Sequence, residues 1–164
     1  MIKRESDIYN TPVEVAIRLL TIIVKYKSQI DFEKLIILDY LSLHANVVCS
    51  EFESIHPDNP FHGLEVYSKM EVSKKAINLL ISKGLIDVEF TTEGISYNYN
   101  VVSEHFLSYF DGEYYEKLKL NIDKVLDFFA SYSSSDLQNY LYDNMSSFGG
   151  KKIDLTSIYK EEVN

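Results

Sequence analysis

Apolar positions dominate the first predicted helix, and its polar positions form one narrow stripe. Thr11 is placed to cap the helix, Pro12 suits its first turn, and Glu14 has the spacing of a capping box. Across residues 12–26 the polar side chains recur every three or four positions, at Glu14, Arg18, Thr21 and Lys25. A helix that is apolar around most of its circumference needs cover on most sides. It is therefore either central in the fold or flanked by an interface.

A second broadly apolar helix is predicted over residues 32–44, with Asp31 as its cap. Two adjacent helices of this kind exceed what a domain of about 100 residues needs to bury internally. Exposed apolar surface of that extent marks interaction sites. The pattern therefore predicts a stable partner or a homodimer.

A third helix and a β-hairpin follow a loop over residues 45–64. The helix is predicted over residues 65–83, and Gly84 is placed to end it. Apolar and polar residues then alternate over 86–90 and again over 95–100, on either side of a turn that contains glycine. Three helices followed by a hairpin is the order of a winged helix-turn-helix.

The remainder of the chain is predicted to be helical. An apolar seam with spacings of three and four residues predicts a helix over 112–131, and it consists of Tyr115, Leu118, Ile122, Val125, Phe129 and Tyr132. Residues 133–135 are serines that can cap a last short helix around Leu137 and Leu141.

These elements predict a mainly α fold with a small β-hairpin, namely a winged helix-turn-helix with a C-terminal helical extension. The expected divisions are a winged-helix domain over residues 9–102, the extension over 103–145 and a flexible tail over 146–164.

Charge and composition narrow the functional classes. The 164 residues carry a net charge of −9, which repels nucleic acid and anionic membranes. No apolar stretch approaches the roughly 20 residues of a membrane span, and the single cysteine cannot form an internal disulfide. We therefore expect a cytoplasmic protein without membrane contact.

The chain shows no motif that predicts a catalytic, cofactor or metal site. The candidate metal ligands His44, Cys49, His56 and His62 are separated by four, six and five residues, without the closely paired ligands of a zinc knuckle. Nucleophile elbows, phosphate-binding glycine loops and HExxH helices are absent. We predict a non-enzymatic protein with no catalytic residue, cofactor or metal.

Winged helices commonly bind DNA, so the third helix and the hairpin are candidate nucleic-acid contacts. The third helix offers only lysines for weak contact with the phosphate backbone, namely Lys69, Lys74, Lys75 and Lys83. The hairpin adds carboxylates of the wrong sign at Asp87, Glu89 and Glu93. Any DNA contact is expected to be weak and indirect, and a DNA-binding transcriptional regulator is the alternative function.

Protein binding is the predicted function. Two candidate partner surfaces are the first helix and the C-terminal seam, through Ile17, Leu20, Val24, Tyr115, Ile122 and Phe129. The same positions also suit a hydrophobic core, and the sequence leaves both interpretations open.

Several segments resemble the small "middle component" subunits of bacterial ABC-three-component systems. They are residues 10–20 (NTPVEVAIRLL), 38–44 (LDYLSLH), the His56-Pro57 pair, and 82–90 (SKGLIDVEF) with Glu93-Gly94-Ile95 and Tyr97. The likeness covers roughly residues 9–130, and the part after Ser133 has no counterpart.

This resemblance implies a partner system. Such subunits accompany an SMC/Rad50-like ATPase and a separate effector, often a nuclease, as in Lamassu-type anti-phage and anti-plasmid defence complexes. The small subunit would join effector to ATPase, and the resemblance implies no catalytic residues.

Overall fold

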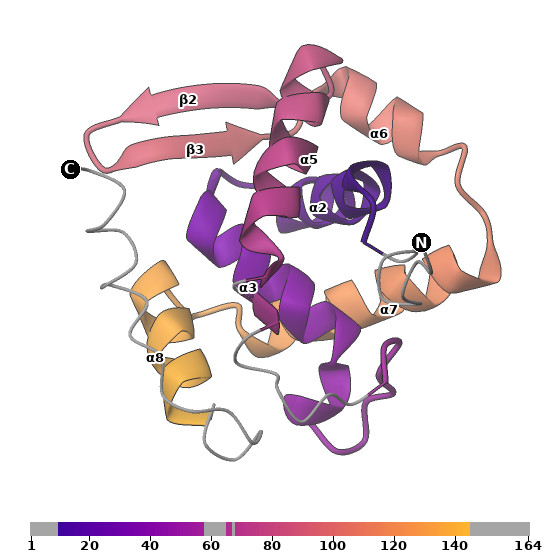
Figure 1. Ribbon diagram of the computed structural model, residues 1–164, viewed down its shortest axis with the longest axis vertical. Coiled ribbons are helices and arrows are strands. Elements are labelled where there is room, and N and C mark those ends of the chain that lie inside the picture. The colour runs from indigo at the N-terminus through magenta and orange to yellow at the C-terminus, as the bar shows by residue number, and fades with distance from the viewer. Residues whose placement is uncertain (1–9, 58–64, 67, 145–164) are drawn as a thin grey trace, which may run out of the picture.

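Two capped helices form the centre of the fold. The computed structural model describes residues 10–57, 65–66 and 68–144 (Figure 1). Helix α2 spans Pro12–Tyr26, and the Thr11 hydroxyl accepts a hydrogen bond from the Glu14 amide. Helix α3 spans Phe32–Leu43, and the Asp31 carboxylate accepts from the Lys34 amide. Both helices and both caps are confirmed.

The sheet has three strands rather than the two that the sequence predicts. Strands β2 (Asp87–Thr91) and β3 (Gly94–Asn98) form the predicted hairpin. A two-residue strand, β1 (Ile30–Asp31), pairs antiparallel with β3, so the order is β1-β3-β2. Two residues between two helices carry no alternation, which is why β1 was not predicted.

The third predicted helix is shorter than expected, and another helix was missed. Helix α5 spans Met70–Ser82. Residues 65, 66 and 68 are also helical, and Lys69, whose backbone is in the right-handed helical region, forms a turn directly before α5. Gly84 follows with a φ of 66°, which confirms its role at the end of the helix. Helix α6 (Val101–Leu107) begins at Asn100, whose side chain accepts from the Val102 and Ser103 amides.

The C-terminal helices confirm the predicted seam. Helix α7 spans Glu113–Phe128, and α8 spans Ser134–Asn144. The Lys34 ammonium donates to the Tyr132 carbonyl over 2.7 Å, and the Ser134 hydroxyl bonds Asp31, so α8 starts against the first turn of α3. The predicted tail over 146–164 lies outside the described residues.

One hydrophobic core joins all of these helices. Helix α2 contacts α3, α5, α6 and α7, while α3 also contacts α7 and α8 (Figure 1). The prediction that α2 and α3 carry more apolar surface than the chain can bury is wrong, because α5, α7 and α8 cover most of it. A mainly helical fold with a small sheet is confirmed.

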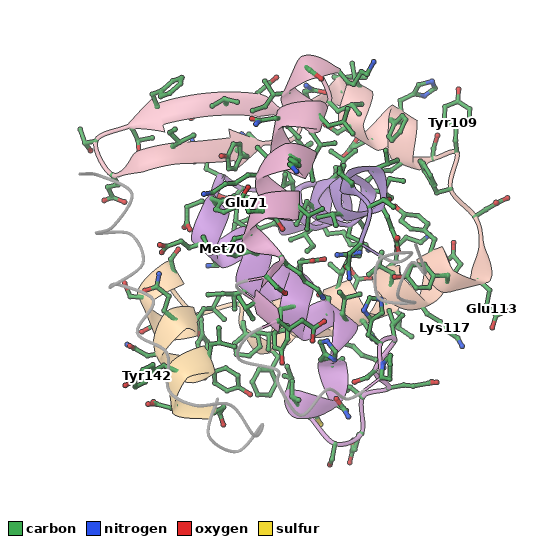
Figure 2. The ribbon with its side chains drawn as sticks, in the orientation of Figure 1. Met70, Glu71, Tyr109, Glu113, Lys117 and Tyr142 are labelled. Atoms are coloured by element: carbon green, nitrogen blue, oxygen red, sulfur yellow. The ribbon has the colours of Figure 1, made fainter. Side chains whose placement is uncertain are left out.

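The periphery of the fold carries exposed tyrosines. Tyr109 lies after α6 and Tyr142 near the end of α8, and both side chains lie at the outside of the molecule (Figure 2).

Within the described residues, none of the helices combines the length and the apolar character that crossing a membrane requires.

Candidate functional site

A buried ion pair between α2 and α3 begins the most polar part of the interior. The Arg18 guanidinium donates to Asp39 through Nε (2.8 Å) and Nη2 (3.0 Å), and both side chains are less than 5% exposed. Burial opposes the charge on Arg18, but the Asp39 carboxylate outweighs it and raises the pKa of Arg18 above its ordinary value. Glu14 lies 3.9 Å from Arg18, and burial raises the pKa of this carboxyl.

A second set of buried polar side chains, His44, Glu65 and Lys69, lies where α3 ends and the chain approaches α5. His44 is fully buried, and its Nε2 lies 3.3 Å from Oε2 of Glu65. The other oxygen of Glu65 lies 2.7 Å from the Lys69 ammonium. Burial favours the protonated acid, yet the hydrogen bond from His44 and the charge of Lys69 lower the pKa of Glu65 to about 2. Glu65 is therefore a carboxylate at neutral pH.

His56 and Tyr114 lie between the Arg18–Asp39 ion pair and the side chains of His44, Glu65 and Lys69. The His56 ring lies edge-on to that of His44, with 6.1 Å between ring centres, and its Nε2 is 3.4 Å from the Tyr114 hydroxyl. Burial and the positive charges of Lys69 and Arg18 lower the pKa of His56 to about 4, so its ring is neutral at pH 7. Burial raises the pKa of Tyr114 to about 12, and this phenol stays protonated.

We call these residues the charged cluster: Glu14, Arg18, Asp39, His44, His56, Glu65, Lys69 and Tyr114. Its carboxyl groups, those of Glu14, Asp39 and Glu65, lie beside the guanidinium of Arg18 and the amino group of Lys69.

Three side chains of the charged cluster have the composition of a metal-binding set. One potential ligand atom from each of His44, His56 and Glu65 lies within 4.8 Å of the other two. The sequence prediction of no metal site considered Cys49 and His62 instead of Glu65. Cys49 is not part of this group, and His62 lies outside the described residues. Nothing in the sequence connects Glu65 with His44, because only the folded chain places them together.

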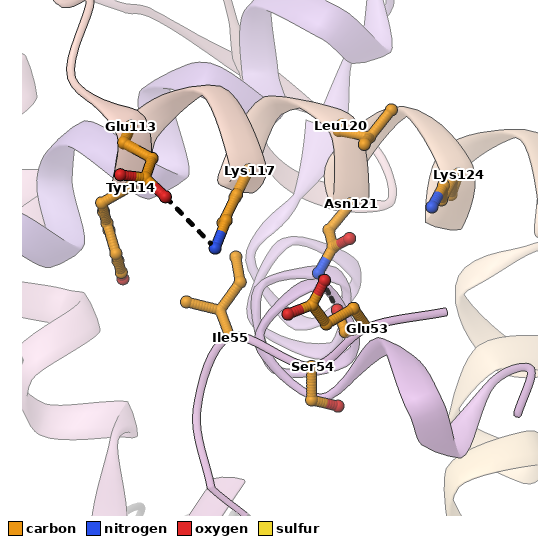
Figure 3. A pocket seen from close by; sticks show the side chains of 9 residues that line it. All are labelled: Glu53, Ser54, Ile55, Glu113, Tyr114, Lys117, Leu120, Asn121 and Lys124. Carbon is orange, nitrogen blue, oxygen red and sulfur yellow. Dashed lines mark hydrogen bonds and ion pairs between the residues drawn. The ribbon is translucent and has the colours of Figure 1, made fainter. Parts of the chain in front are cut away.

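A cleft lies beside the charged cluster, between residues 53–55 and α7 (Figure 3). It encloses about 390 Å³, and Tyr114 lines it as well as contacting His56. Asn121 fixes one wall by donating to the carbonyls of Ser42 (3.1 Å) and Glu53 (2.8 Å). The Glu113–Lys117 pair at its rim spans 3.5 Å. The cleft therefore combines charges of both signs.

A larger groove lies between the hairpin, α5 and the start of α3. It encloses about 980 Å³, and its lining includes Ile77, Asn78, Ile95 and Tyr97. Phe90 and Ile95 face each other across β2 and β3, and they remain 80% and 49% exposed. Ile95 of this hairpin pair lines the groove together with polar residues such as Lys74 and Glu93. The alternation in the sequence predicts that both positions are apolar, but not that Phe90 and Ile95 remain exposed.

The predicted partner residues are mostly in the core. Leu20, Tyr115, Ile122 and Phe129 are buried. Ile17 and Val24 are half-buried and pack against the same core. The six residues therefore hold the helices of one protomer together, and the fully buried ones present no surface to a partner. The expected interface was inferred from apolar periodicity, which a core helix and an interface helix share.

The lysines predicted for weak DNA contact are not equivalent. Lys69 is buried and paired with Glu65, so it does not face a phosphate backbone. Lys74 is half-buried, 3.9 Å from Glu71. Lys75 and Lys83 are exposed, while Glu89 accepts from Gln29 and Asp87 accepts from Asn100. The described helix and hairpin thus present a mixed surface rather than a positive ridge.

Comparisons with known proteins identify a family. The model of the ABC-three component (ABC-3C) system Middle Component 2 matches residues 8–151. Neither the curated proteins nor the solved structures contain a significant match. The matched part extends past the roughly 9–130 of the motif resemblance and includes α7 and α8. The chain therefore belongs to the Middle Component 2 family of ABC-three component systems.

Proposed function

We propose that this chain is a non-catalytic winged-helix adaptor that joins an SMC/Rad50-like ATPase to an effector, such as a nuclease. The complex would act in the cytoplasm against phages or plasmids, as Lamassu-type systems do. The observation that carries the proposal is the family match over residues 8–151, since a middle component is one subunit of a system with several components.

The element order supports the winged-helix part of the proposal. Helix, short strand, two helices and a hairpin follow one another, and β1 pairs with β3 of the hairpin. In this scheme α5 occupies the position of the recognition helix, and β2 and β3 form the wing.

The hairpin pair supports protein binding. Phe90 and Ile95 are directly opposed in the register, so their exposed side chains form one apolar patch beside the groove. Aromatic residues are enriched in the cores of protein interfaces, where charged residues are depleted. The carboxylate of Glu93, which lines the groove together with Ile95, suits the polar rim of an interface and disfavours a nucleic-acid backbone.

Co-purification tests the adaptor proposal. The full chain carries an affinity tag and is co-expressed with the proteins encoded by the neighbouring genes. We expect the tagged chain to retain both an ATPase and an effector, and each of these to require the chain for recovering the other. If the chain elutes alone, or if ATPase and effector associate equally well without it, the adaptor proposal is wrong.

A matched pair of variants tests the surface. Phe90→Ser combined with Ile95→Ser removes the hairpin pair, and Val101→Ser removes an 87% exposed side chain at the start of α6. Truncating an interface core residue costs about 2 kcal/mol, which is roughly thirtyfold in affinity. We expect the double variant to lose affinity for one partner by this amount and the Val101→Ser variant to keep its affinity. Equal retention by both variants would place the interface elsewhere on the chain.

A DNA-binding regulator remains the alternative function, and it has less support. Lys69 is buried, and the hairpin carries the carboxylates Asp87, Glu89 and Glu93. A gel-shift titration of the isolated chain at low salt separates the two functions. The adaptor predicts weak binding without sequence preference, while tight and sequence-dependent binding favours the regulator.

A further inference from the structure

We propose that His44, His56 and Glu65 form a binding site for a divalent transition-metal ion, with Zn²⁺ as the best fit. The three residues come from different parts of the chain: the end of α3, the segment after η1 (Ala45–Val47), and the approach to α5. A bound ion would join these parts and fasten the long connection between α3 and α5.

The donor set matches the chemistry of zinc. Two imidazoles and one carboxylate are a common set of three protein ligands, and a water molecule completes the tetrahedron. The potential ligand atoms lie within 4.8 Å of one another. Atoms bound to one zinc ion through bonds of about 2.0–2.1 Å lie roughly 3.3 Å apart. Side-chain movements of about 1–1.5 Å therefore complete the site.

Neighbouring side chains hold the proposed ligands in place. The Lys69 ammonium lies 2.7 Å from one carboxylate oxygen of Glu65. The second oxygen is therefore directed to Nε2 of His44, which is 3.3 Å away. The Tyr114 hydroxyl lies 3.4 Å from the His56 ring. Hydrogen bonds of this kind orient metal ligands in known sites.

Charges of both signs surround the proposed site. Lys69 and Arg18 are both within the charged cluster and oppose a further positive charge. Glu14, Asp39 and Glu65 outnumber them by one carboxylate, and the Arg18 charge is already paired with Asp39 over two short hydrogen bonds. The competing arrangement is a hydrogen bond between His44 and Glu65 with no ion.

Zinc titration of the full chain tests the site. The purified protein is stripped with a chelator and titrated with ZnCl₂ by calorimetry, while Tm is followed in parallel. We expect one ion per chain and a higher Tm in its presence. Absence of saturable binding would overturn the proposal.

Two variants and a control locate the ion. His56→Asn and Glu65→Gln each remove one ligand, and His105→Asn changes an exposed histidine on α6 that contacts Tyr109 instead. Loss of a ligand should weaken binding by more than the roughly 10–100-fold typical of groups that only orient ligands. The control should bind as the original chain does. Unchanged affinity in both ligand variants would overturn the site.

A spectroscopic measurement keeps the proposal testable even where a variant fails to fold. Co²⁺ is added to the stripped original chain in place of Zn²⁺. Nitrogen and oxygen ligands give visible cobalt bands without the thiolate charge-transfer absorption of a cysteine ligand. That spectrum supports the site, whereas a thiolate band would assign the ion to Cys49 and overturn it.

Discussion

Helix α2 and the hairpin are both rich in apolar residues, yet the fold treats them differently. Leu20 and Ile22 in α2 are fully buried, while Phe90 and Ile95 in the hairpin remain largely exposed. Helix α2 is covered by α3, α5, α6 and α7, whereas the outer half of the hairpin extends beyond the helices (Figure 1). Apolar content therefore does not distinguish a buried element from an exposed one, whereas the position of the element in the fold does.

This difference in burial between α2 and the hairpin predicts different effects of substitution on the free energy of unfolding. Substitutions beneath α2 should change the free energy of unfolding, and substitutions at the hairpin turn should leave it nearly unchanged. We expect the loss of stability to decrease from the buried ion pair in the interior to the exposed hairpin.

Asp39→Asn should have the largest effect. It removes the carboxylate charge that accepts two hydrogen bonds from Arg18, while the guanidinium, whose side chain is 1% exposed, stays charged. Breaking one side of a buried ion pair costs about 3–5 kcal/mol. Urea unfolding followed by circular dichroism measures this loss. The double variant Arg18→Met, Asp39→Leu should recover most of it, since no unpaired charge remains. If the single variant and the double variant unfold at the same urea concentration, the loss does not come from an uncompensated charge on Arg18.

Ile122→Ala should destabilise the chain through a cavity. Ile122 belongs to α7 and is fully buried, and truncation of a buried isoleucine costs about 2–5 kcal/mol. Leu120→Ala is the matched control, because Leu120 lies on the same helix and is 54% exposed. We expect the control to change stability by no more than about 0.5 kcal/mol. Equal losses would contradict the assignment of the α7 seam to the core.

Asn100→Ala should produce an intermediate loss. The side chain caps α6 and donates to the Gly84 carbonyl (3.1 Å) and to Asp87 (3.0 Å), so it ties α6 to the base of the hairpin. Removal of such a cap costs about 0.5–2 kcal/mol. Asn100→Ser retains a capping oxygen and should lose less. A thermal unfolding series compares the two, and a larger loss for serine than for alanine would argue against the cap.

Phe90→Ala should have the smallest effect on stability. Its side chain is 80% exposed, and surface substitutions away from special features change stability by about 0.5 kcal/mol or less. Chemical denaturation provides the measurement. A loss above about 2 kcal/mol would show that the hairpin pair packs within the protomer, and the contrast with α2 would disappear.

Local features of the chain were predictable from the sequence. Thr11 and Asp31 have short oxygen-bearing side chains before apolar runs, and Gly84 tolerates the positive φ that ends α5. The alternation around Gly94 specifies the hairpin in the same way. These signals depend only on residues that are close in the sequence, so they can be recognised without knowledge of the fold.

Helix α6 and strand β1 were missed for a related reason. Each is short, and each is stabilised by distant residues: Ser103 in α6 donates to the Leu85 carbonyl, and Ile30 in β1 pairs with Tyr97. A seven-residue helix and a two-residue strand have too few positions for a recognisable period.

The sequence by itself determined the longer helices, the caps Thr11 and Asp31, the hairpin and the motifs of the family, because all of these reside in contiguous residues. Only the tertiary structure decided which apolar faces are buried and which side chains meet. His44 and Glu65 are 21 positions apart, and the Tyr114 ring comes from another helix. Burial and proximity depend on how elements pack, and a helix carries the same apolar stripe whether its cover comes from its own chain or from another.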